Sequence, residues 1–98
     1  MNTPNWAPRE TEIAVKAYFE TLKAQQQGKS VNRQAVYNKL ATRLSRRNAK
    51  AVEYRFHNIE AILQQEGMKS IGLAPMANTS RLLRAAVLAN YLGLRITR

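Results

Sequence analysis

The stretch YNKLATRLSRRNAKAVEYRFHNI, residues 37–59, decides the fold. Apolar side chains recur in it at helical spacing on both sides of the polar tetrapeptide 45–48. The stripe before the tetrapeptide consists of Tyr37, Leu40, Ala41 and Leu44, and the stripe after it of Val52, Phe56, Ile59 and Leu63. Each stripe is typical of one helix buried along one face. The stretch therefore predicts two helices joined by a short turn, with Asn48 as the N-cap of the second.

Helical spacing and end signals extend this pattern in both directions, and no segment reads as a strand. The expected helices are residues 8–26, a helix of about 12 residues after a cap at Ser30 or Asn32, residues 49–65, and residues 81–92 after a cap at Thr79 or Ser80. Gly28, Gly67 and Gly93 are the expected stops. The predicted fold class is all-α.

Residues 1–66 are expected to form a three-helix, helix-turn-helix bundle. Residues 67–98 are expected to add a loop (67–78) and a C-terminal helix. The apolar face of that helix, with Leu83 and Val87, is broader than a small neighbour can cover. This makes the C-terminal helix the candidate element for packing on another chain, as in a homodimer, and the sequence leaves the oligomeric state open.

Positive charge dominates the composition and is concentrated in the middle of the chain. Sixteen Lys and Arg residues face six acids, for a net charge of +10. Residues 29–55 hold eight of the cations and one acid, a net of +7. A small domain is soluble with a net charge of about 2–8, so solubility alone does not explain the excess. The clustering indicates a surface for a nucleic-acid backbone, with a merely solvated face as the alternative.

Several classes of function lack the residues they need. With no cysteine and a single histidine, disulfides, cysteine nucleophiles and multi-histidine metal sites are excluded. No paired-carboxylate, nucleophile–base or glycine-rich phosphate motif is present, so neither an enzyme nor a cofactor is expected. No apolar run approaches the ~18 residues of a membrane span, and the first residues do not follow a signal-peptide pattern. A cytoplasmic, nucleoid-associated location is expected.

The helix over 49–65 is the expected reader of double-stranded DNA. An α-helix fits the major groove, which is about 12 Å wide. With the apolar stripe turned inward, the opposite face offers donors and acceptors to base edges. The expected DNA-contacting residues are Arg33, Arg46, Arg47, Lys50, Glu53, Tyr54, Arg55 and His57. Arg46 and Arg47 are assigned to phosphates. Glu53 is expected either to accept from cytosine or to form a salt bridge with Lys50 and His57.

Three short motifs carry a resemblance to Myb/SANT-type domains. Trp6-Ala7-Pro8-Arg9-Glu10 is similar to the W-T-x-E-E start of their first helix. Residues 37–47 match W-x-x-I-A-x-x-L, a turn and an arginine, with Tyr37 for Trp, and residues 51–56 match A-V-x-x-x-W, with Phe56 for Trp. The likeness covers residues 6–65. It implies that Trp6, Tyr37 and Phe56 form the core and that the third helix reads the bases.

A narrower resemblance is to the N-terminal helical head domain of McrA-like, modification-dependent HNH restriction endonucleases. The matching residues are Asn5, Trp6, Pro8, Glu10, Ala14, Val15, Ala17, Tyr18, Asn32, Arg33, Asn38, Val52, Glu53, Tyr54, Arg55, Asn58 and Ile59. It implies a bacterial or phage setting and a role in regulation or restriction. No HNH motif is present, so nuclease activity is not implied. The alternative function is a protein-interaction module of SANT type, such as a small phage inhibitor of a host protein.

Overall fold

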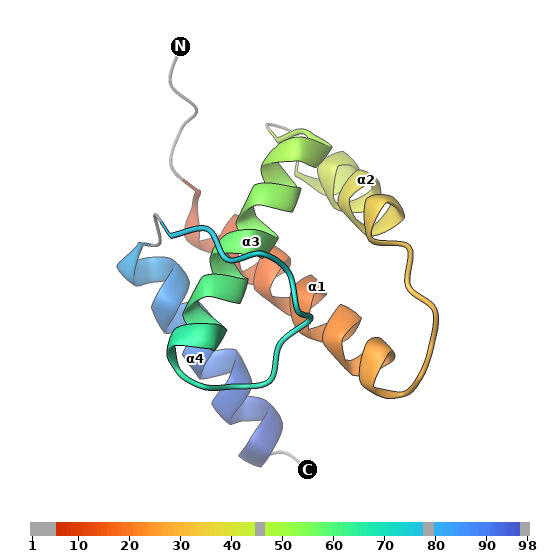
Figure 1. The fold of residues 1–98 in the computed structure, drawn as a ribbon. Helices are drawn as coiled ribbons and strands as arrows, with labels where there is room; N and C mark the ends of the chain where they lie inside the picture. The colour runs from red at the N-terminus through yellow and green to blue at the C-terminus, as the bar shows by residue number, and fades with distance from the viewer. Residues whose placement is uncertain (1–5, 45–46, 78–79, 97–98) are drawn as a thin grey trace.

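The chain folds into four helices around one apolar core (Figure 1). The computed structural model describes residues 6–44, 47–77 and 80–96, and no strand occurs among them. The helices are α1 (Pro8–Gln26), α2 (Arg33–Arg43), α3 (Ala49–Gln65) and α4 (Arg81–Ile96). Helix α3 lies at the centre and packs against the other three, and α1 also packs against α4. The all-α fold class is confirmed.

The start of each helix follows from a local signal. Asn32 and Asn48 cap α2 and α3, because their side chains accept hydrogen bonds from the backbone N–H groups of Ala35 (3.1 Å) and Ala51 (2.9 Å). The Ser80 hydroxyl accepts from the N–H of Leu83 at 3.1 Å and caps α4. Pro8 occupies the first position of α1, where a missing N–H costs nothing. The expected bounds 8–26 and 49–65 are confirmed.

Helix α4 extends beyond its expected end. Gly93 was expected to stop it at residue 92, but the helix runs through the glycine to Ile96. A glycine inside a helix costs only about 1 kcal/mol relative to alanine, and no proline follows to block the next turn. By contrast, Gly28 and Gly67 adopt φ values of 78° and 67°, directly after the ends of α1 and α3. Their left-handed backbone is the reason why those two stops are correct.

The core is built around the ring of Phe56, which is fully buried. The rings of Tyr18 and Tyr37 meet it edge to face, with centroids 5.3 Å and 5.1 Å away. The expectation that Tyr37 and Phe56 are core residues is confirmed. Trp6 is only partly buried and packs against the outside of this core.

The inner face of α4 belongs to the same core. Leu83 and Val87, expected on a docking face, are fully buried within the chain against α1 and α3. A bundle completed by the first three helices would leave these two residues for docking. Instead, α4 packs on α1 and α3 and completes the core. Leu82 remains exposed on the other side of α4. Dimerisation through α4 stays a prediction, but these two residues cannot mediate it while α4 is packed.

Residues 67–77, here called the strap, run back along α3 without forming a helix (Figure 1). They are held by the carboxylate of Glu60, which is fully buried. This carboxylate accepts hydrogen bonds from the Tyr18 hydroxyl (2.7 Å), the Gln64 amide (2.8 Å) and the N–H of Gly72 (3.2 Å). The Tyr18 hydroxyl in turn accepts from the N–H of Ile71 at 3.0 Å. One buried network therefore connects α1, α3 and the strap.

Two opposing effects act on the pKa of Glu60. Burial raises it, but hydrogen bonds from Ser70, Gln64, Tyr18 and the backbone of Leu73 together lower it below its ordinary value of 4.5. Burial also raises the pKa of the Tyr18 hydroxyl, which therefore remains a donor. The charged carboxylate is thus the form that stabilises the fold.

Tyr18→Phe is expected to lower the free energy of unfolding by about 2 kcal/mol, because it removes one of the two donors to a buried carboxylate oxygen and leaves the N–H of Ile71 without a partner. Urea unfolding followed by circular dichroism measures the change. Tyr54→Phe, at a half-exposed ring, is the matched control and should change stability by less than about 0.5 kcal/mol. Equal effects of the two variants would contradict the role assigned to the Tyr18 hydroxyl.

Stability is expected to fall as the pH drops below about 4.5, the ordinary value for glutamate. The folded-state pKa of Glu60 lies below the unfolded value, so in this range the unfolded chain binds more protons. The contribution of the carboxylate is complete above that pH and is lost as the pH falls through the folded pKa. Urea midpoints from neutral pH to about pH 3 should show a shallower decline for Glu60→Gln than for the native chain. Glu12→Gln, at an exposed carboxylate, should keep the native slope.

Candidate nucleic-acid interface

The first two turns of α3 present an open polar surface. Val52 and Phe56 face the core, which turns Lys50 and Tyr54 outward. The Lys50 side chain is 66% exposed and Tyr54 is 49% exposed. These two predicted DNA-contacting residues are accessible, as the helical spacing required.

Glu53 lies between Lys50 and His57 on the same helix. Its carboxylate is 3.6 Å from Lys50 Nζ and 4.0 Å from His57 Nε2. Lys50 Nζ also lies 5.7 Å from the centroid of the Tyr54 ring. Of the two roles expected for Glu53, the intrahelical salt bridge is the one present. Its effect is to offset the charge of Lys50, so this surface is less positive than its lysine alone indicates.

His57 contacts the strap instead of facing outward. Its side chain is 19% exposed, and Nδ1 is 2.6 Å from the carbonyl oxygen of Ala74. A carbonyl oxygen can only accept a hydrogen bond, so Nδ1 carries the ring hydrogen and donates the hydrogen bond to Ala74. His57 is thus partly buried against the strap and does not face outward as expected, because residues 67–77 fold back over this side of α3, a long-range contact that helical spacing does not reveal.

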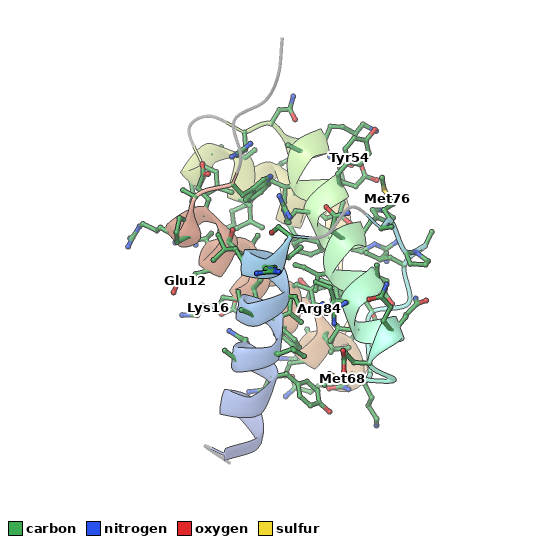
Figure 2. All side chains as sticks on the ribbon, turned by 90° about the vertical axis from the view of Figure 1, so that its left-hand side faces the viewer. Glu12, Lys16, Tyr54, Met68, Met76 and Arg84 are labelled. Atoms are coloured by element: carbon green, nitrogen blue, oxygen red, sulfur yellow. The ribbon has the colours of Figure 1, made fainter. Side chains whose placement is uncertain are left out.

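The strap covers the outer face of α3 from its third turn onward. The Asn58 amide donates to the carbonyl oxygens of Met76 and Ala77, and the N–H of Met76 donates to the carbonyl of His57. Met76 therefore lies one turn from Tyr54, and Figure 2 shows the two side chains at the same corner of the molecule. Only the start of α3 remains open to a long ligand such as DNA.

Arg47 is buried and paired within the chain. Its side chain is 1% exposed, and its guanidinium is 3.0 Å from the Glu10 carboxylate and 4.5 Å from the centroid of the Trp6 ring. The assignment of Arg47 to a phosphate contact is therefore wrong. Glu10 and Trp6 lie at the start of α1, far from Arg47 in sequence. The polar tetrapeptide 45–48 therefore contains no local sign of this pairing.

Arg55 is directed to the same indole. Its guanidinium lies 4.7 Å from the Trp6 ring centroid. Burial, and then the nearby charge of Arg47, lower the pKa of Arg55 below its ordinary value. Arg55 was expected to lie with Lys50 and Tyr54 among the DNA-contacting residues. It is instead half-buried and lies on a different side of α3 from Tyr54. Its role is to fix Trp6 over the end of the core.

Arg33 is exposed at the start of α2, across a groove from α3. The groove has a volume of about 450 Å³ and is lined by Val31, Asn32, Arg33, Gln34, Tyr37, Glu53, His57 and Leu73. Arg33 thus shares this groove with Glu53 and His57 of α3. Arg46, the remaining predicted contact, lies outside the described residues.

Two exposed cations of α2 were counted in the charge of the segment but not assigned to a site. Lys39 and Arg43 line a second groove of about 290 Å³ between α2 and α1, with Glu20 opposite. The signal that could have identified them is the absence of acids, because residues 21–52 contain eight cations and no acid. Helical spacing then places Lys39 and Arg43 one turn apart on α2.

We also searched for a metal site, for a membrane-spanning helix and for similar proteins. Among the described residues, no group of three or more histidine, cysteine, aspartate or glutamate side chains could hold a metal ion. In the same part of the chain, no helix is long and apolar enough to cross a membrane. No protein-family model, no curated protein and no solved structure matches the chain.

Arg47→Gln is expected to act on stability and not on binding. It removes the ion pair between the Arg47 side chain, which is 1% exposed, and the Glu10 side chain, which is 14% exposed, and this should cost about 3 kcal/mol. Thermal unfolding measures the loss. Lys50→Gln removes an exposed cation of the same segment and should change stability by less than about 0.5 kcal/mol. A stable Arg47→Gln protein would contradict the structural role assigned to this arginine.

Proposed function

We propose that the chain binds double-stranded DNA through α2 and the start of α3. The observation that carries this proposal is a set of exposed cations on a segment without acids, residues 29–52. The exposed cations of this segment from residue 29 onward that the structure describes are Lys29, Arg33, Lys39, Arg43 and Lys50. An anionic ligand would relieve their mutual repulsion.

Few acids neutralise these cations. Within residues 6–44, 47–77 and 80–96, the only ion pair formed by this set is that of Lys50 with Glu53. Two of the six acids, Glu60 and Glu10, are buried or nearly so and are bonded within the fold. The exposed cations of this set therefore outnumber the acids that lie near them, Glu20 and Glu53. A polyanion that presents regularly spaced phosphates matches such a surface.

A protein-interaction module of SANT type is less well supported. Protein interfaces centre on apolar and aromatic side chains. The large apolar side chains that are exposed in the described residues are Tyr54, Met76 and Leu82, and none of them lies on α2. A surface of amides, hydroxyls and cations favours a nucleic acid. Binding of this kind fits a nucleoid location and a regulatory or restriction-associated role in a bacterial or phage setting.

The chain is expected to bind duplex DNA with a steep dependence on salt. If about six phosphates are neutralised, affinity should fall by about 10³-fold between 50 and 200 mM salt. Fluorescence anisotropy with a labelled duplex measures the slope. Replacing both Lys39 and Arg43 by glutamine should weaken binding. It should also lower the slope of log affinity against log salt concentration by about two.

Lys16→Gln combined with Lys23→Gln is the matched control, because it removes the same charge from exposed positions of α1. Figure 2 shows Lys16 on the side of the molecule away from Tyr54. This variant should retain nearly all of the native slope. Absence of binding at about 50 mM salt, or equal effects of the two double variants, would reject a localised DNA interface.

A further inference from the structure

Helix α2 is buried less deeply than α1 and α3. Only Tyr37 and Leu40 are buried along it, whereas α1 and α3 each bury seven residues. It packs mainly against α3, and Figure 1 places it at one edge of the molecule, with α4 on the other side of α3. Its 11 residues span about 16 Å, more than the width of the major groove.

The outer face of α2 carries side chains that can contact base edges. Gln34, Ala35, Asn38, Lys39 and Thr42 are all exposed there. Amides can pair with adenine, lysine can donate to guanine, and small methyl groups can contact the thymine methyl. The face holds no acid and no large apolar group.

The two amides on this face are already joined. The Gln34 Nε2 donates to Asn38 Oδ1 at 3.0 Å, one helical turn apart. This bond leaves Gln34 Oε1 as an acceptor beside Asn38 Nδ2 as a donor. Adenine presents the complementary pair in the major groove, an N6 donor next to an N7 acceptor. The pre-formed bond reduces the side-chain freedom that would be lost on binding.

Cations flank α2 on both sides. Lys39 and Arg43 lie toward α1. Arg33 lies toward α3. A helix in the major groove has a phosphate backbone on each side, so two flanking rows match a groove better than one positive face does.

We propose that α2, and not α3, enters the major groove, and that Gln34 and Asn38 together contact one adenine. This inference rests on the proposed DNA binding. The outer face of α3 is a weaker candidate, because the strap covers it from His57 onward and Glu53 offsets Lys50.

The test begins with a site selected by the full chain from a pool of randomised duplexes. Anisotropy titrations then compare this site with duplexes in which single adenines are replaced by 7-deazaadenine, which lacks the N7 acceptor. Replacing the one adenine that Gln34 and Asn38 contact is expected to weaken binding of the native chain about tenfold, and replacing the others is not. The Gln34→Ala, Asn38→Ala double variant should bind both duplexes with the same, weaker affinity. Circular dichroism verifies that the variant is folded.

Gln26→Ala combined with Gln27→Ala is the matched control, because it removes two exposed amides at the end of α1 and should keep the native preference. The inference is overturned if the α2 variant retains the 7-deazaadenine effect, if Lys50→Gln or Tyr54→Ala abolishes it instead, or if the chain binds DNA without preference for any sequence. Those results leave the proposed DNA binding intact. Failure of the native chain to bind any duplex at low salt rejects the proposed function itself.

Discussion

The buried carboxylate of Glu60 is the constraint on which the rest of the structure depends. It accepts hydrogen bonds from Tyr18 of α1, from Gln64 of its own helix and from the strap, and so it determines where the strap lies. A strap held there hydrogen-bonds to His57 and Asn58 and covers most of the outer face of α3. The surface left for a ligand is therefore a consequence of one charged group in the core. An unpaired carboxylate in that position would destabilise the fold strongly, and the number of donors around it is the reason why it is tolerated.

A second internal pairing redistributes the charge of the middle segment. Arg47 and Arg55 both contact the indole of Trp6, and Glu10 accepts from Arg47. These contacts use cations to hold the start of α1 against α3, and they remove both arginines from the surface of Lys50 and Tyr54. What remains exposed is concentrated on α2. The excess of positive charge is thus divided between a structural part and a part that is available to a ligand.

Local signals and distant contacts explain what could be predicted from the sequence and what could not. The bounds of α1 and α3 follow from apolar spacing, caps and stops within a few residues, so they were predictable. Glu60 stands between Ile59 and Ala61 and has no local feature that marks it as buried, because its partner Tyr18 is 42 positions away. Arg47 is likewise paired with a residue 37 positions away. Long-range polar pairs of this kind decide which charged side chains are free, and the candidate site was accordingly less predictable than the helices.

The shallow burial of α2 is consistent with a recognition role. A helix that buries only Tyr37 and Leu40 contributes little to the apolar core, but the edge-to-face contact of Tyr37 with Phe56 fixes its position on α3. Val36 also packs against the core, but the exposed positions of α2 are free of packing demands, and polar residues there cost little stability. The structural constraints are carried instead by α3, which packs on every other helix. Substitutions at the exposed positions of α2 should therefore leave the fold intact, whereas changes along α3 would disturb the core, the strap or both.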